Sequence, residues 1–304
     1  NSTAVALLGD VDGAVKIQGT IVSTGYRSTT RPSDVTKLDA DDLLQGGPAL
    51  VIAGNVSGGI VFDVAPTASD DDDEDDTDID DDGLLDSTET TATVINYGSA
   101  AAVQIGSASA DTSIGVVQGD SSGYGVVVRG AIAGYGIYDG VDANAMVIGG
   151  LGGDVDIAKG VLVAGSITAI SYDSNATALR LGSGATSDAI EISGTVAASG
   201  AALANTTSRG LVIDAGAQVN SVKVSGTVAA VAADDENAAQ GEDRPTEVVA
   251  SSDETTVERA PRAPRAPRRP RGGAEDEAVQ STDDAAALPG FLTRPINQRE
   301  CRHL

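Results

Sequence analysis

The feature that most constrains the fold is an internal repeat. Six segments share one order of residues: apolar positions, a glycine, a small residue and further apolar positions. Their glycines are Gly19, Gly54, Gly130, Gly165, Gly194 and Gly226. In segments such as "IEISGTVAASG" (190–200) and "VKVSGTVAAVA" (222–232), apolar residues alternate with polar ones, which is the periodicity of a β-strand.

A second segment type lies between these copies, as in "AMVIGGLGG" (145–153), "ALRLGSGAT" (178–186) and "GLVIDAGAQ" (210–218). The step from Leu179 to Leu211 is 32 residues, and the step from Ile190 to Val222 is also 32 residues. A fixed period of this size with short strands and glycine corners is typical of a solenoid in which each coil pairs with its neighbours. A β-sandwich, the alternative, does not explain why the glycine recurs in the same place.

Composition agrees with thin, stacked layers, because aromatic residues make up only 3% of the chain and Trp is absent. The core must then be built from Val, Ile, Leu and Ala. We therefore predict an all-β fold, a right-handed parallel β-helix of six to nine coils over residues 1–233, with inserted loops. One insertion is "RSTTRPSDVTKLDADD" (27–42), and an acidic loop covers residues 66–92.

A β-helix with rungs of the "SGTVAA" kind resembles the passenger domains of bacterial autotransporter proteins, particularly large surface proteins of alphaproteobacteria. The resemblance covers about residues 1–233 and implies an exported, extracellular rod with a structural or adhesin-like function at the bacterial cell surface. In that family an outer-membrane β-barrel follows the rod. Alternating barrel strands are not found after Val231, and no signal peptide follows Asn1, so we expect both to lie outside this fragment.

The acidic stretch "DTDIDDDGLLDSTE" (76–89) contains the D-x-D-x-D-G-x5-E pattern of an EF-hand-type calcium loop. Gly83 supplies the bend at position 6. The predicted ligands, at positions 1, 3, 5, 7, 9 and 12, are Asp78, Asp80, Asp82, Leu84, Asp86 and Glu89. The flanks have no helical pattern, so the loop is similar to the bare calcium loops of thrombospondin type 3 and dockerin modules. We predict a structural Ca²⁺; the alternative is a solvated acidic spacer.

A second calcium pattern is weaker. The segment "GGLGGDVDI" (149–157) matches the start of the RTX repeat, but Asp156 stands where a large apolar residue belongs, and only one copy is present. We interpret these glycines as a corner of the rod.

Enzymatic chemistry has little support in the sequence. Asp154 and Asp156 share one face of a strand, but two nearby acids are weak support in a chain with 45 acidic residues. The only histidine is His303, which excludes a histidine-based triad in the rod. Tyr124, Tyr135 and Tyr138 form either a sugar-stacking stripe or, as we favour, a cover over a corner. We expect no enzyme; the competing hypothesis is a β-helical glycosidase or lyase.

The pattern stops after Ala233, and residues 234–304 are polar and disordered in composition. Three interpretations of the arginine- and proline-rich segment "RAPRAPRAPRRPRGG" (259–273) stay open. It is a stiff basic arm, an ordinary disordered tail, or the product of a frameshift in a GC-rich gene.

Charge and composition limit the partners. A net charge of −26 argues against nucleic acid, and no run of about 18 apolar residues predicts a membrane-spanning helix. The lone Cys301 excludes an internal disulfide. We expect a host or environmental surface ligand such as a glycan, and self-association through exposed β-helix ends. A third functional class is an acidic calcium-binding S-layer or matrix component.

Overall fold

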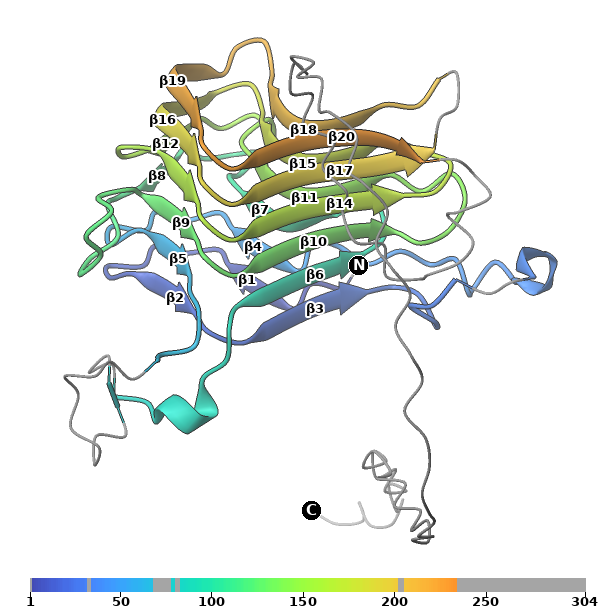
Figure 1. The fold of residues 1–304 in the computed structure, drawn as a ribbon, viewed down its shortest axis with the longest axis horizontal. Helices are drawn as coiled ribbons and strands as arrows, with labels where there is room; N and C mark the ends of the chain where they lie inside the picture. Colours follow the sequence, from blue (N-terminus) through green and yellow to red (C-terminus); the bar gives the residue numbers. More distant parts are fainter. Residues whose placement is uncertain (1, 32–33, 68–77, 80–82, 202–204, 234–304) are drawn as a thin grey trace, which may run out of the picture. The chain divides into compact units, whose positions relative to one another are not determined.

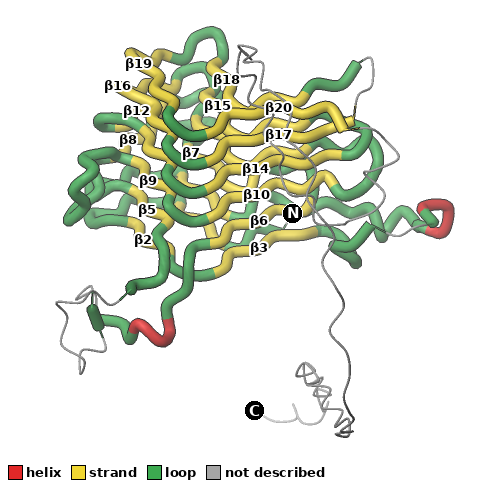
Figure 2. Tube along the Cα trace, viewed as in Figure 1, coloured by secondary structure: helices red, strands yellow, loops and turns green. Residues whose placement is uncertain are grey.

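The structure, a computed structural model, describes residues 2–31, 34–67, 78–79, 83–201 and 205–233. Figure 1 shows that the strands of this part of the chain are stacked in layers along one axis. Figure 2 separates these strands from the loops that leave the stack and from two short 3₁₀ turns. These turns are η1 (Val35–Lys37) and η2 (Asp86–Thr88).

The strands form three sheets, which we name A, B and C. Sheet A contains β1 (Val5–Leu7), β4 (Leu50–Ile52), β7 (Ala101–Ile105), β11 (Ala143–Ile148), β15 (Ala176–Leu181) and β18 (Ser208–Ile213). Sheet B contains β2 (Val15–Ile17), β5 (Ile60–Phe62), β8 (Thr112–Ile114), β9 (Val126–Val128), β12 (Val155–Ile157), β13 (Val161–Val163), β16 (Ala185–Ile192) and β19 (Gln218–Val224). Sheet C contains β3 (Thr20–Thr24), β6 (Thr93–Tyr97), β10 (Ala131–Gly136), β14 (Ser166–Ser171), β17 (Thr195–Ala201) and β20 (Thr227–Ala233).

The chain visits the sheets in the order A, B, C and then returns to A, so that β1, β2 and β3 make the first coil. Neighbouring strands pair in parallel, as β1 does with β4 and β10 with β14. Six coils of this kind follow one another between Val5 and Ala233. The predicted parallel β-helix is therefore confirmed.

The core consists of apolar columns that run through the coils. Residues in one column occupy the same register position on successive strands, because a parallel in-register sheet places identical positions above one another. The sheet A column is Leu7, Ile52, Ile105, Ile148, Leu181 and Ile213. The sheet C column is Ile21, Val94, Ile132, Ile167, Val196 and Val228. Each fully buried member contributes about 1.5–3 kcal/mol, so the columns are the main source of cohesion between coils.

The corner between sheets B and C explains most of the repeated glycines. A Cβ on Gly194 would lie 2.1 Å from the carbonyl oxygen of Gly165, and a Cβ on Gly226 would lie 2.1 Å from that of Gly194. At these two positions a larger residue is excluded because the backbones of successive coils are in contact. Glycine is thus required at Gly194 and Gly226 by close stacking.

One of the six glycines was assigned to the wrong corner. Gly54 stacks on Gly9, whose carbonyl oxygen a Cβ on Gly54 would meet at 2.1 Å, at the end of a sheet A strand. The residue that follows Gly19 in the B–C corner is Ala92, because the Thr93 N–H donates to the Gly19 carbonyl at 2.8 Å. The sequence match at Gly54 was misleading because both corners have apolar residues before a glycine.

Two long insertions leave the rod. The first insertion (residues 25–49) joins β3 to β4, and the second insertion (residues 63–92) joins β5 to β6. The second insertion includes the acidic loop predicted over residues 66–92, of which 68–77 and 80–82 lie outside the described residues. The predicted tail, residues 234–304, also lies outside them.

Candidate functional site

The second insertion is held to the rod at its base. The Gln18 side-chain amide donates to the Val64 carbonyl at 3.0 Å, and the Ala92 N–H donates to the Asp63 carbonyl at 2.8 Å. The two ends of the insertion therefore meet at the corner between sheets B and C. This arrangement places the base of the second insertion next to the ends of β2 and β5, which pair with each other in the first two coils.

Four of the six predicted calcium ligands lie in the described residues, whereas Asp80 and Asp82 do not. The Gly83 N–H donates to Asp78 Oδ2 at 3.0 Å, and the Ile79 N–H donates to Asp86 Oδ1 at 3.2 Å. Gly83 has a φ of +87°, in the left-handed region that favours glycine. The loop therefore turns back at Gly83 and brings the Asp86 carboxylate next to the backbone at Asp78.

Leu84 and Glu89 are placed differently from each other. Leu84, whose carbonyl is the predicted ligand at position 7, is exposed. The Glu89 side chain is only 2% exposed, and its Oε1 lies 4.0 Å from Lys16 Nζ on β2. Glu89 follows η2, and its N–H donates to the Asp86 carbonyl at 3.1 Å. In this structure Glu89 therefore joins the base of the loop to the rod by an ion pair.

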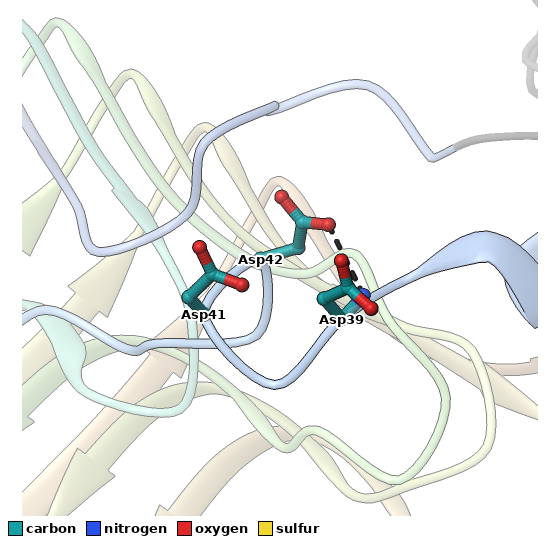
Figure 3. Close-up of side chains that lie close together, drawn as sticks. All are labelled: Asp39, Asp41 and Asp42. Atoms are coloured by element: carbon teal, nitrogen blue, oxygen red, sulfur yellow. Dashed lines mark hydrogen bonds between the residues drawn. The ribbon is translucent and has the colours of Figure 1, made fainter.

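A second group of carboxylates, not predicted as a site from the sequence, lies in the first insertion. Asp39, Asp41 and Asp42 have carboxylate oxygens within 4.8 Å of one another (Figure 3). The Asp39 N–H donates to Asp42 Oδ2 at 3.1 Å, and Arg27 Nη1 lies 3.8 Å from Asp42 Oδ1. The only sequence signal was the acidic segment "DADD" (39–42). Three carboxylates in this arrangement have the chemistry to hold a hard cation.

Five of the six tyrosines lie in one group at the C-terminal ends of the sheet C strands. We call this group the tyrosine cluster: Tyr26, Tyr97, Tyr135, Tyr138 and Tyr172. The Tyr26 and Tyr138 rings meet edge to face at 4.7 Å, and Tyr97 stacks on Tyr135 at 5.5 Å. Arg31 of the first insertion lies 4.3 Å above the Tyr172 ring and forms an ion pair with Asp139.

The tyrosine cluster joins the first insertion to the rod. Leu38 of the insertion packs against it, and the Tyr138 hydroxyl donates to the Ser28 carbonyl at 3.1 Å. Burial raises the pKa of Tyr26 to about 12, with a smaller effect from the neighbouring Tyr138. Of the three tyrosines noted in the sequence, Tyr135 and Tyr138 belong to this cluster. Tyr124 lies elsewhere, with its hydroxyl 2.7 Å from Glu191 Oε2.

Asp142, at the corner before β11, is engaged in structural contacts, whereas the pair considered for catalysis is not. Asp142 Oδ1 accepts hydrogen bonds from the Asn175 N–H and side-chain amide, both at 3.1 Å, and Asn175 Oδ1 accepts from the Thr207 N–H at 3.0 Å. This ladder ties three successive corners together. Asp154, which precedes β12, and Asp156, which lies on it, are both exposed. Their separation in sequence is the sole support for a catalytic pair.

The glycines of 149–153 form the corner between β11 and β12, as their sequence predicts. Gly149 and Gly150 have φ values of 72° and 78°, which only glycine adopts without strain. The corner between the two strands therefore explains why this segment is rich in glycine.

Comparison with known proteins identified no relatives: no family model, no curated protein and no solved structure matches the chain. Among the described residues, no helix has the length and apolar character needed to cross a membrane.

Proposed function

We propose that this chain is a structural, adhesin-like rod that projects a binding surface from a bacterial cell, as the passenger domains of autotransporter proteins do. The observation that carries this proposal is the stack of six coils with a continuous apolar core. Such a core makes a solenoid a stiff spacer, because each coil is held by the coils next to it. The proposed partner is a host or environmental surface ligand, and glycans are the class to test first.

The test measures binding and chemistry on the same samples. Purified chain is applied to surfaces coated with polysaccharides and to whole cells, and the supernatant is assayed for released reducing ends and unsaturated sugars. We expect the chain to be retained on at least one surface and to release no sugar product from it. Release of product would instead support the competing glycosidase or lyase hypothesis. Failure to bind any surface would overturn the adhesive function.

We further propose that the second insertion binds one structural Ca²⁺. Two features of the loop support this: the reversal at Gly83 and the approach of the Asp86 carboxylate to the start of the loop. Carboxylates that crowd together in water repel one another, so a cation would order the loop.

Calorimetry tests the calcium proposal directly. We expect a Ca²⁺ binding signal that is lost in Asp78→Ala and in Glu89→Ala. The matched control is Asp41→Ala in the first insertion, which, like each of these variants, removes one carboxylate charge. If the signal survives in Asp78→Ala and Glu89→Ala but disappears in the control, the ion binds at the carboxylate cluster of the first insertion shown in Figure 3.

Self-association is the third part of the proposal. Residues that continue the buried columns are exposed on the sixth coil, where Val222 is 46% and Val224 is 52% exposed. Exposed apolar residues beside strand edges favour pairing with another chain. Light scattering across a concentration series should show mass increasing with concentration, and a constant monomer mass would contradict this. Calcium-dependent growth of the particles would favour an S-layer or matrix role.

A further inference from the structure

The strands of sheet A carry no acidic residue, although the chain is acidic. Two rows of side chains cross its strands. One row is Ala6, Val51, Gln104, Val147, Arg180 and Val212, and the other is Ala101, Asn144, Thr177 and Arg209. Neither row contains a carboxylate, although the chain as a whole carries a net charge of −26. The strands of this face therefore contribute no negative charge of their own, which is also true of sheet C.

A groove of about 280 Å³ lies on this face, over β7, β11 and β15. Its lining combines Gln104, Asn144 and Arg180 with the apolar side chains of Val147 and Leu151. Gly149 and Gly150 line the groove beside Leu151, and having no side chains they leave this part of it open. The groove is thus open, and its wall combines apolar atoms with a few polar groups.

The polar groups of the groove retain free hydrogen-bonding positions. Asn144 uses its amide N–H in a 2.9 Å bond to the Ser99 carbonyl, and Gln104 uses its own in two long bonds of 3.4 Å. Their side-chain oxygens accept no hydrogen bond from the described residues. The groove therefore presents two amide oxygens as acceptors.

Arg180 supplies donors of fixed direction. Its Nε–H donates to Asp214 Oδ2 at 2.7 Å, and its Nη2 lies 2.6 Å from the same oxygen in an ion pair. A guanidinium has five N–H groups in one plane, so the remaining ones are held in place by this ion pair. The pair also cancels the charge of Arg180, which makes the groove locally neutral.

We propose that this groove binds a short segment of a neutral polysaccharide. Adjacent sugar hydroxyls match the donors of Arg180 and the acceptors of Gln104 and Asn144, and the C–H face of a sugar ring matches Val147 and Leu151. A charged polysaccharide fits less well, because the net charge repels a polyanion and no unpaired cation lines the groove. The inference rests on the proposed adhesive function and names the ligand class.

The test uses the full chain and calorimetric titration with neutral hexasaccharides of glucose, xylose and mannose, and with a galacturonate hexamer. We expect a neutral oligosaccharide to bind and its affinity to be insensitive to salt. Arg180→Ala and Gln104→Ala should each weaken binding by about tenfold, because each removes one or two hydrogen bonds. The matched control is Arg209→Gln, on the same face outside the groove. A second variant, Val147→Arg, fills the groove without removing any of its polar groups.

The outcomes separate this inference from the proposed function. Binding that persists in Arg180→Ala, Gln104→Ala and Val147→Arg would overturn the groove, while the adhesive function would stand. Binding of the galacturonate hexamer alone, weakening with salt, would overturn the assignment of a neutral ligand. If the chain binds neither the oligosaccharides nor any coated or cellular surface, both proposals fail.

Discussion

The two insertions show two ways of attaching a long loop to the same rod. The first insertion is attached mainly through aromatic contacts, because Tyr26, Arg31 and Leu38 pack into the tyrosine cluster. The second insertion is attached through polar and ionic contacts, including the ion pair between Lys16 and Glu89. At its described tip, Leu84 and Leu85 are 56% and 53% exposed. An insertion with its own apolar cluster needs no ligand for order, whereas one made of carboxylates benefits from a cation.

Removing an aromatic ring should have the largest effect. Tyr138 is 2% exposed and contacts both Tyr26 and the first insertion. Tyr138→Ala is expected to lower the free energy of unfolding by about 3–5 kcal/mol and to make the first insertion sensitive to proteases. Tyr138→Phe is the control, since it keeps the ring and loses only the hydrogen bond to Ser28, worth about 1 kcal/mol. Equal losses in both variants would show that the hydroxyl, and not the ring, holds the insertion.

The ion pair of the second insertion should come next. Lys16→Met removes the cation beside a nearly buried carboxylate, and we expect a loss of about 1–3 kcal/mol in urea unfolding. Glu89→Gln in the same chain should restore part of this loss, because the carboxylate charge is then gone. A double-mutant cycle measures the coupling. Strictly additive losses would mean that the 4.0 Å contact does not couple the two residues.

Calcium should have a smaller effect, and it should slow the cleavage of one insertion but not of the other. At a free Ca²⁺ concentration about ten times the dissociation constant, a loop that is cleaved only when unliganded is protected about tenfold. We expect this slowing at the second insertion, measured by limited proteolysis and mass spectrometry of the fragments, and no change at the first insertion. Equal protection of both would show that the ion acts through the whole rod.

Alkaline pH should weaken the attachment of the first insertion through Tyr26. Burial raises the pKa of Tyr26 to about 12 from its ordinary value of 10.0. The folded protein therefore keeps the phenol proton at pH values where the unfolded chain has lost it. The stability that Tyr26 contributes is present in full below pH 10 and is lost as the pH rises towards 12. Tyrosinate absorbance and protease sensitivity of the first insertion should rise together, and Tyr26→Phe should weaken this pH dependence.

Much of the rod could be predicted from the sequence because its contacts repeat at short, regular intervals. The spacing of Ile190 and Val222 places them one above the other, and the structure pairs them in register. Gly194 and Gly226 were predicted to recur at one corner, and they do. Gly54 was misplaced because local sequence around a corner does not say which two sheets the corner joins. Which two sheets a corner joins depends on how the chain is connected through the insertions.

The candidate sites divide in the same way. The calcium pattern from Asp78 to Glu89 lies within twelve consecutive residues, so its spacing is visible in the sequence. The contact of Glu89 with Lys16 was not predicted, because the two residues are 73 positions apart and meet only when the second coil stacks on the first. The groove on sheet A is made by residues of three coils. No local pattern indicates that Gln104, Val147 and Arg180 form one row.

The sequence by itself thus determined the repeating coil and its apolar columns, because both depend on residues at fixed short spacings, and it shows the calcium pattern of the acidic loop only as a spacing of residues. The tertiary structure alone decided the tyrosine cluster, the position of Glu89 and the groove of sheet A. In these places, side chains from distant coils are brought together by stacking. The physical reason is that periodicity specifies which side of a strand each residue faces, whereas contacts across the stack depend on register and on how much chain each insertion takes up.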